Sequence, residues 1–155
     1  MSVIDWLVTV GLCMAPVSEL RGGLPYAAAN GAHPAVAYVV CVLANLIPVV
    51  PVMLGLTAVE RILARWTPTR RAHDWVAART RRKGRVIERL GAIGLVLLVA
   101  VPLPGTGAWT GALAAVLLGW SLRRSVPLIT LGVLIAGGVV LCGVLLGVRL
   151  LSGAA

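Results

Sequence analysis

The stretch "PVSELRGGLP" (Pro16–Pro25) places an acidic and a basic residue in the middle of an apolar segment. Glu19 and Arg21 are the only charged residues between positions 6 and 32, and prolines and glycines surround them. Such residues interrupt a helix. A charge at membrane depth costs about 2.5–3.5 kcal/mol, so intramembrane charges are usually paired and functional. The stretch therefore predicts a broken intramembrane helix whose turn carries a functional pair.

The composition of the whole chain indicates that the bilayer is part of its solvent. Of 155 residues, 59% are hydrophobic and 12% are charged, and the mean hydropathy is +0.98. A soluble domain of this length could not cover its surface with so few polar groups. We therefore expect an all-α integral membrane protein that forms a single domain over residues 1–155.

Two long apolar segments are predicted to cross the membrane. Residues 34–59 and 125–150 each carry at most one formal charge, and each exceeds the ~20 residues that a helix needs to span a ~30 Å hydrocarbon core. The first contains "NLIPVVP" (Asn45–Pro51), where Asn45 is expected either to cap a kink or to hydrogen-bond the first turn. The glycine-rich run 132–147 is expected to allow close helix packing or dimerisation.

Two further apolar segments are too long for one span and too short for two. In residues 90–122 the stretch "VPLPGTGAW" (Val101–Trp109) breaks the helix near its middle, and residues 3–32 have the same form around Pro16. Arms of about 14 residues reach only ~20 Å, so both turns should lie inside the membrane. We predict two re-entrant helical hairpins, whose irregular turns must be covered by protein or line a wet cavity.

The order hairpin, span, linker, hairpin, span predicts an inverted repeat. Each hairpin returns to its starting side and each span crosses, so the second unit is inverted relative to the first. Aligning Pro16 with Pro102 also aligns the pair Ala28-Ala29 with Ala114-Ala115. Inverted repeats of broken helices are typical of transporters, with binding sites where the turns meet.

The basic residues predict the orientation. Residues 60–89 hold ten of the fourteen Lys and Arg residues, which indicates a cytoplasmic linker with an amphipathic helix and both termini outside the cell. A net charge of +9 also fits binding to nucleic acid. We favour a topogenic role with attraction to anionic lipid, because no nucleic-acid-binding module surrounds the cluster.

No enzyme or cofactor chemistry is expected. Cys13, Cys41 and Cys142 lie in apolar runs, and the two histidines are too isolated to complete a metal site. "PGTGAWTG" lacks the Gly-Lys-Ser/Thr ending of a nucleotide-binding loop. Ser18 has no His or Lys partner in its segment, so it is not expected to be a hydrolytic nucleophile.

The two turns are the predicted binding site. We expect half-helices to begin near Leu24-Pro25 and near Thr106-Gly107, with Pro25 in the first helical turn, and to aim their positive N-terminal ends at an anion. Arg21 would act as an anion-binding fork and Glu19 as the proton carrier; alternatively, the two charges only neutralise each other and lock the turn. Three further groups complete the predicted site. The glycines that would allow close approach of a ligand are Gly22, Gly23, Gly105 and Gly107. The other residues of the second turn are Pro102, Pro104 and Thr106, and the supporting polar residues are Ser18 and Asn45.

The strings "PVSELRGGLPYA" (Pro16–Ala27) and "VPLPGTGAWTGALAA" (Val101–Ala115) resemble the small multi-drug export proteins. That family is similar to the DedA membrane proteins, which share the hairpin and span repeat and are implicated in proton-driven recycling of undecaprenyl phosphate. The resemblance implies that Glu19 matches the acidic residue of the first DedA hairpin. DedA proteins have arginines around their second turn, whereas this chain has none between Arg89 and Arg123.

The sequence thus predicts a small proton-coupled membrane transporter that works as a homodimer or larger oligomer. Its substrate would be anionic or amphiphilic, either a lipid phosphate or a drug-like molecule, held between the two turns. The alternative is a non-transporting membrane scaffold whose Arg-rich linker recruits a cytoplasmic partner.

Overall fold

The computed structural model describes residues 1–63, 91–103 and 105–152, and its regular elements in these ranges are helices. The elements follow the chain in this order: α1 (Val3–Met14), α2 (Glu19–Ala29), α3 (Pro34–Leu46), α4 (Val49–Leu63), the helix Gly91–Ala100, α6 (Ala108–Leu117) and α7 (Leu122–Ser152). Most of the predicted linker, residues 60–89, lies outside the described residues. The predicted orientation across the membrane therefore stays a prediction.

Two helices are long and apolar enough to cross a membrane. They cover Pro34–Val59, with a mean hydropathy of 2.4, and Leu122–Leu150, with a mean hydropathy of 2.6. The first is interrupted between α3 and α4, where a kink was expected, because Pro48 has no N–H to continue the helix. Large apolar side chains such as Val3, 76% exposed, and Leu117, 66% exposed, lie on the outside of the bundle, which suits contact with lipid.

The other helices form two hairpins with short arms. The 12 residues of α1 extend only about 18 Å, well short of a ~30 Å hydrocarbon core, and α2, α6 and the helix Gly91–Ala100 are shorter still. The α1 N-terminus is capped by Ser2 and Asp5, whose side chains each bond the other's backbone N–H. The hydrogen bonds that the Asp5 carboxylate accepts from the backbone N–H and the hydroxyl of Ser2 lower the pKa of Asp5.

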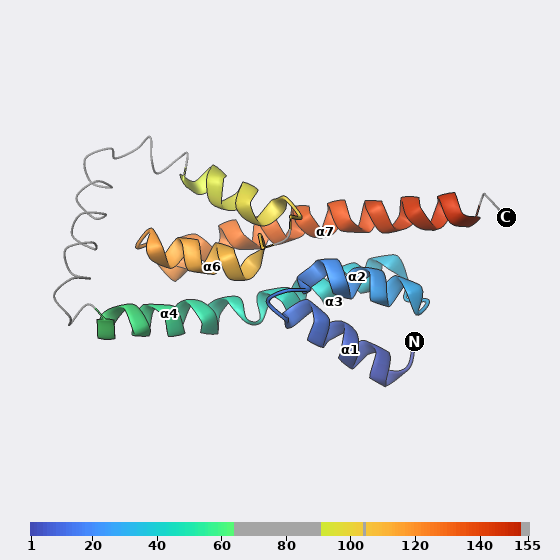
Figure 1. Ribbon diagram of the computed structural model, residues 1–155, viewed down its shortest axis with the longest axis horizontal. Helices are drawn as coiled ribbons and strands as arrows, with labels where there is room; N and C mark the ends of the chain where they lie inside the picture. Colours follow the sequence, from blue (N-terminus) through green and yellow to red (C-terminus); the bar gives the residue numbers. More distant parts are fainter. Residues whose placement is uncertain (64–90, 104, 153–155) are drawn as a thin grey trace.

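The hairpins lie against different parts of the long helices. Figure 1 shows α1 and α2 beside α3, and α6 beside α4, while α7 runs along both groups and contacts α2, α3, α4 and α6. The hairpin arms extend in opposite directions from the middle of the molecule, where the two turns meet. This arrangement brings residues of the two predicted turns together; the repeat itself and the re-entrant course in a membrane remain predictions.

Two glycines of α7 allow close packing inside the chain. A side chain at Gly132 would meet Val99, and one at Gly137 would meet the ring of Tyr38. The Tyr38 hydroxyl donates a 2.9 Å hydrogen bond to the backbone carbonyl of Leu134. Close packing within this chain is therefore seen at two glycines of the run 132–147, whereas Gly138, Gly143 and Gly147 have open space around them. The predicted oligomer is not tested by it.

Candidate functional site

Glu19 lies at the contact between the two hairpins and is held in an unusual conformation. It is 6% exposed and begins α2 with a φ of 47°, a left-handed value that costs an L-residue about 1–2 kcal/mol. Such strain persists where the surroundings fix a residue, commonly at a functional site. The backbone N–H of Trp109, in the first turn of α6, donates to its carboxylate over 3.4 Å.

The start of α6 is shaped to receive this carboxylate. Gly107 precedes the helix with a φ of 156°, and a Cβ at this position would lie 1.8 Å from Oε2 of Glu19. The Gly107 N–H donates to the hydroxyl of Thr110 over 2.9 Å, which leaves the next N–H groups to face Glu19. A carboxylate beside a helix N-terminus is favoured by the positive end of the helix dipole. Glu19 thus occupies the anion position that was predicted for a substrate at α6.

Arg21 contacts the same turn from the other side. Its Nη1 donates to the carbonyl oxygen of Leu103, and its Nη2 donates to the carbonyl oxygen and, over 3.3 Å, to the hydroxyl of Thr106. A planar guanidinium is suited to two carbonyls that lie side by side. These carbonyls belong to the break between two helices, where intrahelical hydrogen bonds end. The Leu103 carbonyl also accepts from the N–H of Thr106 over 3.1 Å, so Arg21 adds a second donor there and bonds the Thr106 carbonyl as well.

The two turns therefore cap each other. The indole N–H of Trp109 donates to the carbonyl oxygen of Met14 at the end of α1 over 3.2 Å. Glu19 and Arg21, in contrast, do not form an ion pair with each other; each bonds the backbone of the second hairpin. The interpretation of the pair as an internal salt bridge is not supported by these contacts.

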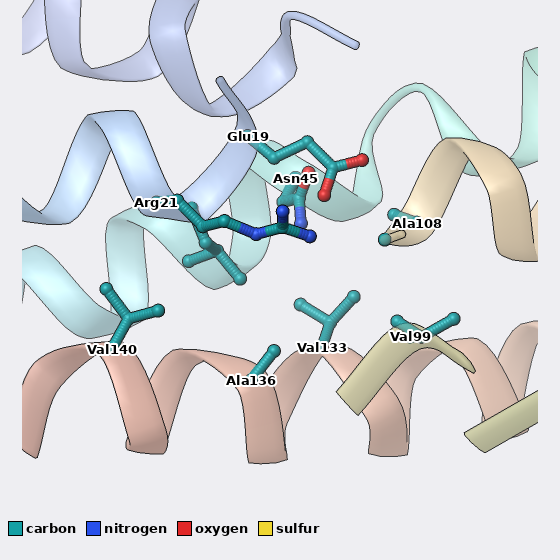
Figure 2. A pocket seen from close by; sticks show the side chains of 10 residues that line it. Glu19, Arg21, Asn45, Val99, Ala108, Val133, Ala136 and Val140 are labelled. Carbon is teal, nitrogen blue, oxygen red and sulfur yellow. The ribbon is translucent and has the colours of Figure 1, made fainter. Parts of the chain in front are cut away.

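A small cavity lies between these groups and α7. Its volume is about 10 Å³, room for roughly one water molecule. Glu19, Arg21 and Asn45 are its charged or polar side chains, and the wall on α7 consists of Val133, Ala136 and Val140. Figure 2 shows the side chains of Glu19, Arg21 and Asn45 directed into this space. A drug-sized ligand needs ~300 Å³ or more, so this cavity is too small to hold one in the conformation described.

Two expectations about the first turn are wrong. The half-helix begins at Glu19 rather than near Leu24-Pro25, so Pro25 lies inside α2 and not in its first turn. The earlier start places Leu20 and Leu24 in the core, and the proline removes one backbone hydrogen bond.

The glycines of the first turn also have a different role from the predicted one. Gly23 is buried away from the cavity, where a Cβ would lie 2.1 Å from Sγ of Cys13 and 3.4 Å from Sγ of Cys41. A Cβ at Gly22 would lie 2.7 Å from Cβ of Ser18. Gly23 therefore allows α2 to pack against α1 and α3, Gly22 leaves room for Ser18 at the N-cap of α2, and neither lines the cavity.

The remaining predicted residues are placed around the turns. Ser18 donates its hydroxyl hydrogen bond to the carbonyl oxygen of Leu12 over 2.6 Å, which ties the first turn to α1. Gly105 has a φ of 83° and open space around it, Pro102 is partly exposed, and Pro104 lies outside the described residues. As expected, α6 begins directly after Gly107.

Several contributors were not predicted from the sequence. Trp109, Met14 and Leu103 act through backbone groups or an indole N–H, and the cavity wall on α7 is apolar. Trp109 had one available signal, because it directly follows the expected start of a half-helix. Within the described residues, no group of three or more His, Cys, Asp or Glu residues is arranged to hold a metal ion.

Comparison with protein families supplies the remaining evidence. Residues 19–139 match the family model described as "Putative small multi-drug export protein". The chain belongs to this family. The match begins at Glu19, the first residue of α2, and includes Arg21, the second turn and α7 up to residue 139. The family and the two long apolar helices together support a location in the membrane. Searches of curated proteins and of solved structures found no match.

Proposed function

We propose that this protein is a proton-coupled membrane transporter in which Glu19 carries the proton and the substrate binds between the two turns. The observation that carries the proposal is the position of Glu19. This residue is buried on one hairpin, its backbone has a left-handed φ, and its carboxylate accepts a hydrogen bond from the first turn of α6 on the other hairpin. When a titratable group lies in the contact between two structural units, its protonation can change how easily the two units separate.

The proposed coupling is electrostatic. The ionised carboxylate is stabilised by the N-terminal end of α6 and by a charge-assisted hydrogen bond from Trp109. Protonation removes the charge and weakens both interactions. The turns then separate more easily, and the cavity of about 10 Å³ can grow into a substrate site. Re-ionisation of Glu19 restores the contact and closes the site.

The charges at the cavity favour an anionic substrate that travels with the proton. With Glu19 ionised and Arg21 protonated, the lining groups sum to zero. Protonation of Glu19 leaves one positive charge, which is costly where water is excluded unless an anion accompanies it. The described contacts of Arg21 use three of its hydrogen-bonding directions, and a guanidinium has five N–H donors. The substrate would be an amphiphile with an acidic head group, such as a lipid phosphate or an acidic drug-like molecule.

The family description favours a second candidate. Export against an inward proton gradient requires proton and substrate to move in opposite directions, and the family is described by drug export. In this case a cationic amphiphile would displace the proton from Glu19. The two candidates share the same proton carrier. They differ in whether proton and substrate move in the same direction or in opposite directions.

Purified protein in liposomes with an enclosed pH-sensitive dye tests both. A gradient of an acidic amphiphile should drive protons in the direction of the substrate, whereas proton movement against a cationic amphiphile would select the second candidate. Glu19→Gln should lower substrate-driven proton flux at least about tenfold. Asp5→Asn is the matched control, an acid-to-amide change at an N-terminal cap remote from the cavity, and it should leave the flux unchanged. Wild-type flux in Glu19→Gln would overturn the proposal.

A further inference from the structure

Asn45 is a buried polar residue whose oxygen has no partner. It lies near the end of α3, is 2% exposed, and its Oδ1 atom accepts no hydrogen bond. If its role were to cap the interruption between α3 and α4, Oδ1 would accept from a backbone N–H there, and it does not. A buried acceptor without a donor is unfavourable and calls for an explanation.

The surroundings of Asn45 point to Glu19. Both side chains line the same cavity as Arg21, and Figure 2 shows the three side chains directed into the same space. Arg21 is the one other charged group among the described residues that line this cavity. The other lining residues are Leu20 of α2, Gly107 and Ala108 at the start of α6, and valine and alanine of α7 and the helix Gly91–Ala100, so their side chains contribute no donor. The described contacts of Arg21 go to Leu103 and Thr106.

We infer that Asn45 is the hydrogen-bond acceptor for the proton carried by Glu19. An ionised carboxylate is an acceptor only, so it cannot satisfy a second acceptor; a protonated carboxyl has one O–H to donate. The unpartnered Oδ1 of Asn45 is therefore unsatisfied when Glu19 is ionised and satisfied when Glu19 is protonated. The proton comes from hydronium in the aqueous phase, which is left as water; it forms the O–H bond on the carboxylate, and this O–H then donates to Oδ1.

This arrangement gives the protonated state its own stabilising contact. Glu19 loses the attraction of the α6 N-terminus on protonation and gains the hydrogen bond to Asn45 on α3. Asn45 is thus a positioning residue that raises the pH at which Glu19 is half protonated. The inference rests on the proposed function only in taking Glu19 as a group that binds a proton.

The direct test is the protonation midpoint of Glu19 in lipid nanodiscs. Carbon NMR of side-chain-labelled glutamate, with the Glu19→Gln spectrum subtracted, follows this residue as the pH is changed. Asn45→Leu removes the acceptor at similar volume and should lower the midpoint by about 0.5–1 pH unit, the equivalent of one lost hydrogen bond. The matched control is Ser125→Ala, which removes another buried unpartnered oxygen outside the cavity and should not change the midpoint. An unchanged or higher midpoint in Asn45→Leu overturns the inference.

A second measurement does not require a titration. Glutamine at position 19 has an N–H that can donate to Asn45, as the protonated acid would. Glu19→Gln should therefore lower the melting temperature more in the Asn45→Leu background than in the wild type. Additive effects on the melting temperature would contradict the inference. Neither experiment uses substrate or a proton gradient, so a protein that transports nothing would still give these results, and the failure of the two proposals can be told apart.

Discussion

The two turns meet with different chemistry. The first turn contributes charged side chains, Glu19 and Arg21, whereas the second contributes backbone: the carbonyls of Leu103 and Thr106 and the N–H of Trp109. Breaking a helix exposes unpaired donors and acceptors, and the first turn carries the two charges that complete them. The second turn thus contributes mainly backbone groups, and only at Gly107 would a side chain obstruct the contact with Glu19.

The largest expected effect tests the backbone side of the contact. Gly107→Ala would place a Cβ 1.8 Å from Oε2 of Glu19. The Glu19 side chain must then turn away from the N-terminus of α6 and lose that contact, and we expect a loss of about 3 kcal/mol in unfolding free energy from the lost contact and the positive φ together. Gly105→Ala is the matched control, because Gly105 also has a positive φ but open space around it. It should cost only about 1–2 kcal/mol. Equal losses of unfolding free energy for the two variants in reversible denaturation would mean that backbone strain, and not the contact with Glu19, causes the loss.

The second prediction concerns the side chains that the first turn contributes to the contact between the turns. Arg21→Gln removes charge-assisted hydrogen bonds to two carbonyls and should cost about 1.5–3 kcal/mol. The double variant Glu19→Gln, Arg21→Gln restores a neutral cavity but cannot restore these bonds. We expect it to stay about 1.5 kcal/mol or more less stable than the wild type. Full recovery in the double variant would show that the two charges act mainly on each other.

The smallest effect concerns a side chain that supports the second turn. The Thr106 hydroxyl lies 2.7 Å from the carbonyl oxygen of Val101 and accepts from the N–H of Leu103 over 3.2 Å. Thr106→Val keeps the shape and should cost about 1 kcal/mol, with a lower apparent affinity for substrate. Thr57→Val removes a single hydroxyl bond within α4, to Met53, and is the control. If both changes leave substrate affinity equal, the Thr106 hydroxyl does not order the turn.

The sequence predicted which segments would be broken and that Glu19 and Arg21 would lie where the two turns meet. The long apolar helices, the start of α6 after Gly107 and the placement of Glu19 and Arg21 follow from charge, length and glycine or proline content. The partners of these side chains did not follow, because a backbone N–H or carbonyl leaves no residue-type signal. Membrane orientation, the inverted repeat and the oligomer remain predictions.

The errors in the first turn have a packing cause. Gly23 was assigned to ligand approach, but it is needed for contact with Cys13 and Cys41. From the sequence alone, a glycine that leaves room for a ligand cannot be distinguished from one that leaves room for a neighbouring helix. Likewise, Pro25 was placed at a helix start from its local preference, whereas burial of Leu20 and Leu24 carries α2 back to Glu19.

The central claim is that the proton on Glu19 controls the contact between the turns. Electron–electron distance measurements test it most directly, with spin labels at Val17 and Leu103, which are 91% and 56% exposed on the first and second turn. The exposed Cys142 is replaced by serine so that the labels attach only at the chosen positions. In nanodiscs we expect a short, narrow distance distribution at high pH, a longer and broader one at low pH, and the low-pH distribution at every pH in Glu19→Gln. A distribution that does not change with pH, or a Glu19→Gln variant that still changes with pH like the wild type, would contradict the account.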